Sequence, residues 1–159
     1  MTERATFAAG CFWRVEEAFR KVNGVRSTTV GYTGGTTRNP TYEEVCTDKT
    51  SHAEVVQVEY DPSVVSYEDL LKVFWESHDP TTPNRQGPDF GSQYRSAIFY
   101  HDEKQKTAAI ASRDKLQSSD RFNKKRIVTE IVTAKEFYRA EDYHQQYLQK
   151  RGLAHCRLC

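Results

Sequence analysis

The order of periodic apolar segments constrains the fold of this 159-residue chain more than any other feature. Apolar residues alternate, or recur at helical spacing, in segments predicted to run strand, helix, strand, strand, helix, strand, and then helix, strand, helix. In chain order the segments are residues 6–10, 12–22, 25–32, 54–60, 66–78, 94–101, 103–117, 127–133 and 140–150. The first six match the split βαβ pattern of ferredoxin-like folds. We therefore predict an α+β fold: a two-layer sandwich with a βαββαβ core, an added helix and strand, and an irregular C-terminal tail.

No linker, repeat or low-complexity tract divides the chain, and its length suffices to close one hydrophobic core. We expect residues 1–159 to form a single domain in which 153–159 are a flexible tail. Two long loops, 33–51 and about 80–93, interrupt the predicted elements, and residues 42–45 of the first could form a helical turn. Loops of this length inside a compact domain are usually functional or disordered.

Charge and cysteine content exclude several classes of protein. The net charge is +1, and the basic cluster Lys124-Lys125-Arg126 is too short to indicate nucleic-acid binding. No apolar run is long enough to span a membrane, and no signal peptide precedes Thr6. Four cysteines without secretory features favour a reducing compartment and redox or metal chemistry. We expect a cytoplasmic protein with neither nucleic-acid nor membrane partners.

Cys11 lies between a predicted strand that ends at Gly10 and a predicted helix that begins at Phe12. Unpaired N–H groups and the helix dipole favour an anion there, so a thiol at this position can lose its proton near neutral pH. The rings of Phe12 and Trp13 would give the thiolate an apolar, water-poor surface. These features indicate a reactive cysteine that meets a small apolar group. The alternative is an inert core residue, because cysteine is among the most buried residue types.

Four other residues are candidates for chemistry. Glu54 opens a valine-rich strand, either as a solvated charge or as a partly buried acid. Burial would raise its pKa and keep it protonated, as a general acid requires. Tyr42, Tyr94 and Asp89 lie in or beside the long loops, where each by itself is typical of packing or turn chemistry.

The chain ends in Cys156-Arg157-Leu158-Cys159, a pattern typical of half a zinc site or of a redox pair. Zinc would require two further ligands, and none stands at a recognisable spacing, so the pattern favours a redox role. Thiols on a flexible tail could reach back to a reactive cysteine and capture its oxidised form. Cys46 has no feature beyond its residue type, and we interpret it as a packing residue.

The string Gly10-Cys11-Phe12-Trp13 strongly resembles the active-site signature of peptide methionine sulfoxide reductase A. Other segments match that family in the same order, from about Phe7 to Tyr147: residues 31–35, 39–45, 52–54, 78–81, 84–87 and 93–96. The family's two-layer fold with a ferredoxin-like core agrees with the predicted element order. Two residues depart from the pattern, Arg14 and Ser51, each where the family commonly has glycine. Neither departure removes a group that the family's chemistry needs.

The resemblance implies that the chain is an oxidoreductase that reduces methionine S-sulfoxide, protein-bound or free, to methionine. By this resemblance Cys11 is the nucleophile, and Phe12 and Trp13 line the pocket for the substrate's S-methyl group. Glu54 would protonate or polarise the sulfoxide oxygen. Arg14 would either favour the thiolate or project to solvent.

The resemblance also implies that Tyr42 and Tyr94 donate hydrogen bonds to the sulfoxide oxygen, with Asp89 as a supporting polar group. Oxidised Cys11 would be resolved by Cys156, with Cys159 as a relay, although either thiol could attack first. An external dithiol such as thioredoxin would reduce the resulting disulfide. The resemblance implies no metal or organic cofactor, and we expect a monomer.

Two other classes of function remain open on the sequence. One is a non-enzymatic thiol sensor or zinc-binding module built on Cys11 and the C-terminal pair. The other is a cysteine hydrolase that uses Cys11 with His52 or His78, two histidines near loop ends with no obvious partner.

Overall fold

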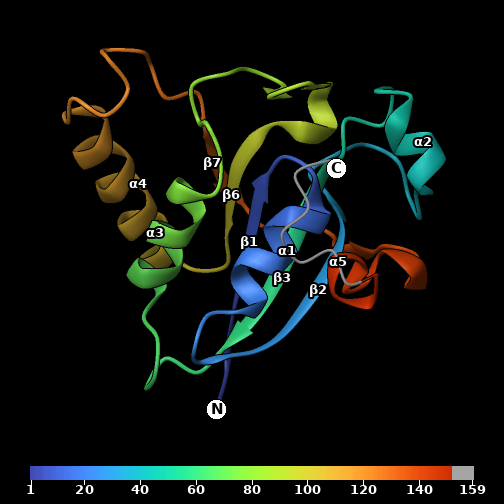
Figure 1. Ribbon diagram of the computed structural model, residues 1–159, viewed down its shortest axis with the longest axis horizontal. Helices are drawn as coiled ribbons and strands as arrows, with labels where there is room; N and C mark the ends of the chain where they lie inside the picture. Colours follow the sequence, from blue (N-terminus) through green and yellow to red (C-terminus); the bar gives the residue numbers. More distant parts are fainter. Residues whose placement is uncertain (152–159) are drawn as a thin grey trace.

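The computed structural model describes residues 1–151 (Figure 1). Its strands are β1 (Glu3–Ala9), β2 (Val25–Thr33), β3 (Ala53–Tyr60), β4 (Arg85–Gln86), β5 (Asp89–Phe90), β6 (Ser96–Tyr100), β7 (Glu130–Thr133) and β8 (Tyr138–Arg139). Its α-helices are α1 (Phe12–Arg20), α2 (Tyr42–Cys46), α3 (Tyr67–Glu76), α4 (Glu103–Gln117) and α5 (Tyr147–Lys150). Two 3₁₀ turns, η1 (Ser92–Tyr94) and η2 (Asp142–His144), complete the elements.

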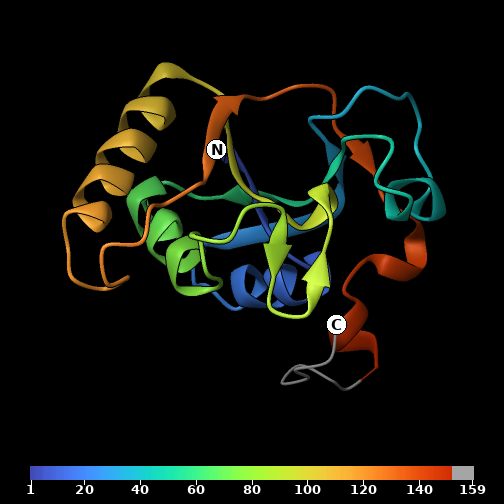
Figure 2. The same cartoon turned by 90° about the horizontal axis from the view of Figure 1, so that it is seen from above.

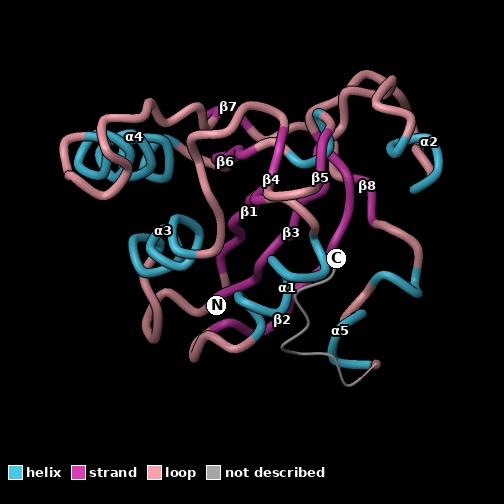
Figure 3. Tube along the Cα trace, turned by 45° about the horizontal axis from the view of Figure 1, so that its top comes forward, coloured by secondary structure: helices cyan, strands magenta, loops and turns pink. Residues whose placement is uncertain are grey.

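The main sheet has six strands in the order β7-β6-β1-β3-β2-β8 (Figure 3). The four strands β6, β1, β3 and β2 pair antiparallel, with α1 between β1 and β2 and α3 between β3 and β6 in the chain. This is the predicted ferredoxin-like core, so the predicted fold class is confirmed. The remaining strands extend it: β7 runs parallel to β6 after α4, and β8 pairs antiparallel with the edge of β2.

Helices α1 and α3 cover one face of the sheet, as expected for a two-layer fold (Figure 2). The core between the layers is aromatic: Phe7 of β1 stacks on Phe19 of α1 and Phe74 of α3, with ring centroids 4.9 and 5.3 Å apart. The opposite face carries a smaller cluster that includes Val55 and Phe99, against which Phe137 packs. Phe137 belongs to the segment that joins β7 to β8 and crosses this face in Figure 2.

The starts of α2 and α3 follow local rules, whereas the start of α1 does not. The predicted capping box at α3 is present, because Asp69 N donates to Ser66 Oγ (3.0 Å) and Ser66 N donates to Asp69 Oδ2 (3.2 Å). A second capping box, between Thr41 and Glu44, starts α2. The N-cap of α1 is Cys11, whose side chain does not cap the helix. The first turn of α1 therefore depends on other parts of the protein for its partners.

The structure corrects the prediction of one helix over residues 140–150. This segment contains only the turn η2 and the short helix α5, separated by Gln146 in a left-handed conformation (φ 50°). The Gln145 side chain accepts a hydrogen bond from Val30 N and donates to Val30 O and Ala140 O, all at 2.9–3.0 Å. Side-chain pairing with the edge of β2 therefore replaces the regular helix that the periodicity predicted.

Two smaller differences concern loops. The second predicted loop contains a hairpin of β4 and β5, joined by Gly87 and Pro88. The predicted strand 127–133 is regular only from Glu130, because Ile127 N and Val128 N bond to Gln117 Oε1 and Pro80 O instead. Residues 152–159 lie outside the described residues, and with them Cys156, Cys159 and the predicted tail. Among the helices of residues 1–151, none has the length and apolar character that crossing a bilayer demands.

Candidate active site

Cys11 lies at the junction of β1 and α1, as predicted, and its residue is 7 % exposed. The junction lies at the carboxyl end of β1, which is an inner strand of the sheet between β6 and β3. Gly10 turns the chain there with φ +97°, a left-handed conformation that favours glycine. A Cβ at Gly10 would come within 2.9 Å of Gln86 Cγ. The glycine before the cysteine thus allows the β4–β5 hairpin to approach the junction.

Glu54 is a buried acid beside the same junction. The antiparallel register pairs Phe7 of β1 with Val56 of β3, which brings Glu54 to the end of β1 where Cys11 follows. The residue is 1 % exposed, and its Oε1 accepts a hydrogen bond from Phe12 N at 3.2 Å. Of the two sequence alternatives, the structure therefore shows a buried acid and not a solvated charge.

The two predicted tyrosines share the electrostatic environment of Glu54. Burial, and then the charge of Glu54, raise the pKa of Tyr42 and the pKa of Tyr94 well above the usual value. Asp89 and Cys11 also act on Tyr94. Both hydroxyls therefore remain protonated hydrogen-bond donors, and the structure brings all five predicted catalytic residues into one electrostatic neighbourhood.

Asp89 belongs to β5 of the small hairpin and is partly buried. Burial raises the pKa of Asp89, and the opposing charge of Arg14 acts to lower it. Arg14 is exposed, and its charge also acts on His78. Arg14 thus projects to solvent, as one of the two alternatives predicted, and its charge still acts on Asp89.

Phe12 and Trp13 contribute to an aromatic cluster next to the junction. Phe12 is buried, and its ring centroid lies 5.7 Å from that of Tyr32 and 6.3 Å from that of Tyr42. Trp13 is half-buried; its Nε1 donates to His144 Nδ1 at 2.9 Å, and its ring stacks on Tyr147 at 3.8 Å between centroids.

Sequence analysis missed the part of this cluster that comes from the C-terminal segment. Glu141 accepts hydrogen bonds from Tyr32 Oη (2.9 Å) and Tyr42 N (3.0 Å), and so ties the first long loop to this segment. An open pocket adjoins the cluster, and its lining residues are Trp13, Tyr42, Tyr143, His144, Tyr147, Lys150 and Arg151. The aromatic residues Tyr143, His144 and Tyr147 could have indicated this cluster in the sequence. The prediction of one regular helix over residues 140–150 drew attention away from them.

Three other sequence candidates remain. Cys46 is exposed, so its interpretation as a packing residue is wrong; its side chain bonds with that of Tyr42, and Gln93 Nε2 donates to its Sγ at 3.5 Å. His52 pins the first loop, since Nδ1 accepts from Gly35 N (3.0 Å) and Nε2 donates to Thr37 O (2.7 Å). Both ring nitrogens of His78 are likewise engaged, with Phe74 O and Ser96 Oγ. These bonds leave neither histidine a nitrogen to serve Cys11 as a base, which argues against the hydrolase alternative.

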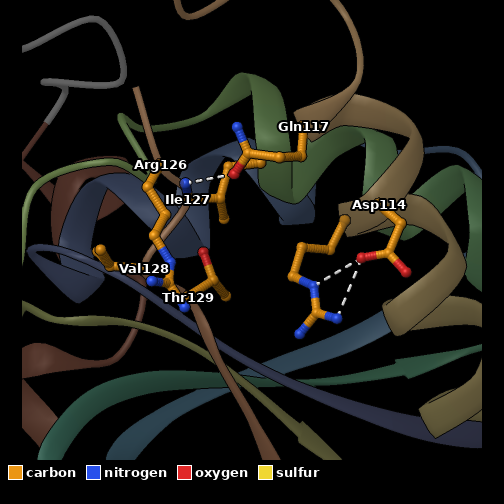
Figure 4. Close-up of a pocket in the computed structure, with 7 residues that line it drawn as sticks. Asp114, Gln117, Arg126, Ile127, Val128 and Thr129 are labelled. Atoms are coloured by element: carbon orange, nitrogen blue, oxygen red, sulfur yellow. Dashed lines mark hydrogen bonds and ion pairs between the residues drawn. The ribbon is translucent and has the colours of Figure 1, made fainter. Parts of the chain in front are cut away.

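A second pocket lies away from this constellation. It is formed by α4 and residues 126–129 and includes Gln117 and Thr129, and none of the predicted site residues lines it (Figure 4). The hydrogen bond from Ile127 N to Gln117 Oε1 joins its two sides. Within residues 1–151, no three His, Cys, Asp or Glu residues are grouped so that they could hold a metal ion.

Comparisons with known proteins agree with this geometry. The family model for peptide methionine sulfoxide reductase matches residues 3–159. The peptide methionine sulfoxide reductase MsrA of Methanosarcina acetivorans is 65 % identical over 94 % of this chain and 79 % of the relative. The crystal structure of reduced Mxr1 from Saccharomyces cerevisiae superposes with a TM-score of 0.89 at 38 % identity, covering 95 % of this chain and 86 % of that one.

A further structure shows yeast Mxr1 in complex with Trx2, with a TM-score of 0.64 at 28 % identity; it covers 92 % of this chain and 84 % of that one. The match to the family model includes the Cys11 junction, the Glu54 strand and both tyrosines, which the fold brings together. The chain therefore belongs to the peptide methionine sulfoxide reductase A family, and its reaction is the reduction of methionine sulfoxide.

Proposed function

We propose that Cys11 is the nucleophile of this reaction and that the enzyme acts on the S epimer of methionine sulfoxide. The observation that carries the proposal is the buried carboxyl of Glu54, held on Phe12 N directly beside the N-terminus of α1. An acid and a thiol at one helix start suit a substrate whose oxygen must gain a proton while its sulfur is attacked.

In the proposed first step, Glu54 and the hydroxyls of Tyr42 and Tyr94 surround the sulfoxide oxygen. Proton donation to that oxygen makes the sulfur electrophilic, and the Cys11 sulfur attacks it. The attack forms an S–S bond; the protonated oxygen then moves from the substrate sulfur to the Cys11 sulfur while this S–S bond and the substrate S–O bond break. Methionine leaves as the reduced sulfide and Cys11 becomes a sulfenic acid, so the oxygen and the oxidation state pass from substrate to enzyme. Phe12 and Trp13 would exclude water from the S-methyl group.

In the proposed second step, a thiol condenses with the sulfenic acid, which releases water and leaves a disulfide. We assign this role to Cys156, with Cys159 as relay, both near the C-terminal end of a single catalytic domain of residues 1–159. A thioredoxin would then reduce the disulfide by exchange, which the Mxr1 complex with Trx2 supports by analogy. We further propose a monomer that acts in the cytoplasm, where thiols are kept reduced.

The first test incubates the protein with the separate S and R epimers of N-acetyl methionine sulfoxide and dithiothreitol. We expect sulfide from the S epimer alone, and none from a Cys11→Ser variant. Product from the R epimer would overturn the stereochemical part, and product from the variant would overturn the nucleophile. If neither epimer reacts and the protein holds stoichiometric zinc, the zinc-module alternative is correct instead.

The recycling step needs a separate test with two reductants. We expect Cys156→Ser to lose multiple turnover with thioredoxin, yet to retain one turnover without reductant and multiple turnover with dithiothreitol. If Cys159→Ser behaves in this way and Cys156→Ser does not, the order of the two thiols is reversed. Cys46→Ser is the thiol control: this thiol is exposed on α2 beside Tyr42, and we expect the variant to keep multiple turnover with thioredoxin.

A further inference from the structure

Glu16 is a buried acid on the helix that carries the signature residues. It is 1 % exposed and lies one turn after Trp13 on α1. Three donors surround its carboxylate: Thr28 Oγ1 at 2.7 Å, Gln146 N at 2.8 Å and Gln146 Nε2 at 2.6 Å. Burial raises the pKa of Glu16, and these hydrogen bonds oppose that rise. A buried carboxylate is stable only when its oxygens accept hydrogen bonds, and both oxygens of Glu16 do so.

Two of the three donors belong to Gln146, the residue in the left-handed conformation. Non-glycine residues rarely adopt that conformation unless the surroundings impose it. The Gln146 side chain also donates to Thr28 O at 3.1 Å, so residues of both β2 and α1 bind Gln146. Glu16 thus fixes the point at which η2 ends and α5 begins.

The residues on either side of this point contact Trp13. His144, two positions earlier, accepts the indole N–H at 2.9 Å, and Tyr147, the next residue, stacks on the ring with an interplanar angle of 10°. His144 is fully buried, with its ring centroid 4.5 Å from that of Tyr42. The contacts form a closed circuit that runs from Trp13 along α1 to Glu16, across to Gln146, and back through His144 and Tyr147.

We propose that Glu16 is a positioning residue, which through Gln146 holds His144 and Tyr147 against Trp13 and so sets the wall of the substrate pocket. The inference rests on the role of Trp13 in the proposed function. Glu16 does not touch the reacting atoms, so its removal should weaken substrate binding more than it slows the chemical step.

The test uses a Trp75→Phe background, in which Trp13 is the sole tryptophan. In that background we compare Glu16→Gln with Glu17→Gln, a neighbouring acid that pairs with Arg20 and Lys21 instead. The measurements are kcat and KM for the S epimer of N-acetyl methionine sulfoxide, and acrylamide quenching of Trp13 fluorescence.

We expect Glu16→Gln to raise KM about tenfold, to change kcat less than about threefold and to increase quenching, because an amide at position 16 opposes the Gln146 amide. Glu17→Gln should leave all three unchanged. Unchanged KM and quenching in a folded Glu16→Gln protein, even with a lower melting temperature, would overturn the proposal.

If Glu16→Gln does not fold, Gln146→Ala replaces it, because this variant leaves the Glu16–Thr28 bond in place. The same rise in KM and in quenching is expected, and unchanged values overturn the proposal. Fluorescence quenching does not depend on turnover, so the positioning of Trp13 is tested even if the proposed function fails.

Discussion

The two sides of the site are built in different ways. Cys11 and Glu54 are held by neighbouring inner strands, β1 and β3, whose register is set by backbone hydrogen bonds. His144 and Tyr147 come instead from residues 138–150, where regular structure is limited to a two-residue strand, a 3₁₀ turn and a short helix.

Beyond the short backbone pairing of β8 and Ala140 with β2, this second side is docked by side chains. Gln145 bonds to the edge of β2, and Gln146 bonds to Glu16 of α1. A backbone ladder tolerates substitution of any one side chain, whereas a side-chain clamp fails when one residue is lost. Changes on the first side should therefore alter chemistry and spare the fold, and changes on the second should alter stability and pocket shape.

The largest effect is expected at the thiol. Cys11→Ser should lower kcat/KM at least about a thousandfold, because a hydroxyl is a far weaker nucleophile than a thiolate. The melting temperature should stay within about 3 °C of wild type, because the ladder and not the side chain holds the junction. Cys46→Ser is the matched control, and an equal loss of activity in that variant would contradict the assignment.

Glu54→Gln comes next. A general acid of this kind contributes about a hundredfold to ten-thousandfold, so single-turnover sulfide formation should slow by about that range. Glu59→Gln, on the same strand but with a side chain 43 % exposed, should react at the wild-type rate. A Glu54→Gln rate within a factor of about three of wild type would remove the acid from the mechanism.

The tyrosines should give a smaller effect with a distinct pH signature. We expect the Tyr42→Phe/Tyr94→Phe double variant to lower the single-turnover rate about tenfold. Tyr100→Phe, at the end of β6, should leave that rate unchanged. Burial and the Glu54 charge raise the pKa of both hydroxyls, so the donor form persists and ionisation should not slow the wild-type single-turnover rate up to pH 10. In Glu54→Gln the charge of Glu54 is absent, so any decline of the rate at high pH should begin at a lower pH than in wild type. A wild-type decline below pH 9 that the double variant lacks would contradict the pKa direction.

The smallest effect on rate is expected at the clamp. Gln145→Ala removes the side-chain partner of Val30 N and of Ala140 O, while Val30 O keeps its bond from Ala140 N; the loss should lower the free energy of unfolding by about 2–4 kcal/mol. For a chain of this size the melting temperature should fall by about 4–16 °C. Gln149→Ala, an exposed neighbour on α5, is the control. If Gln145→Ala melts as the control does, the C-terminal segment is held by something other than side-chain clamps.

Particular elements show where sequence reasoning succeeds. The Ser66–Asp69 capping box, the strand that Glu54 opens and the Cys11 junction depend on neighbours in sequence, and each is found in the structure. The reasoning fails at residues 140–150, because a helical pattern there is overridden by bonds from Gln145 and Gln146 to residues more than a hundred positions away. It fails also at Cys46, because cysteine is usually buried but the residue type does not decide the exposure of a particular position.

The sequence by itself determined the ferredoxin-like core and the candidate residues Cys11, Glu54, Tyr42 and Tyr94, because periodicity, caps and motif strings are local. Only the tertiary structure decided that Glu54 is buried against the start of α1 and that Glu16 grips Gln146. Pairing across the sheet and docking of the C-terminal segment join residues that are 42 and 130 positions apart. Contacts at such separations follow from how layers pack, which no local pattern encodes.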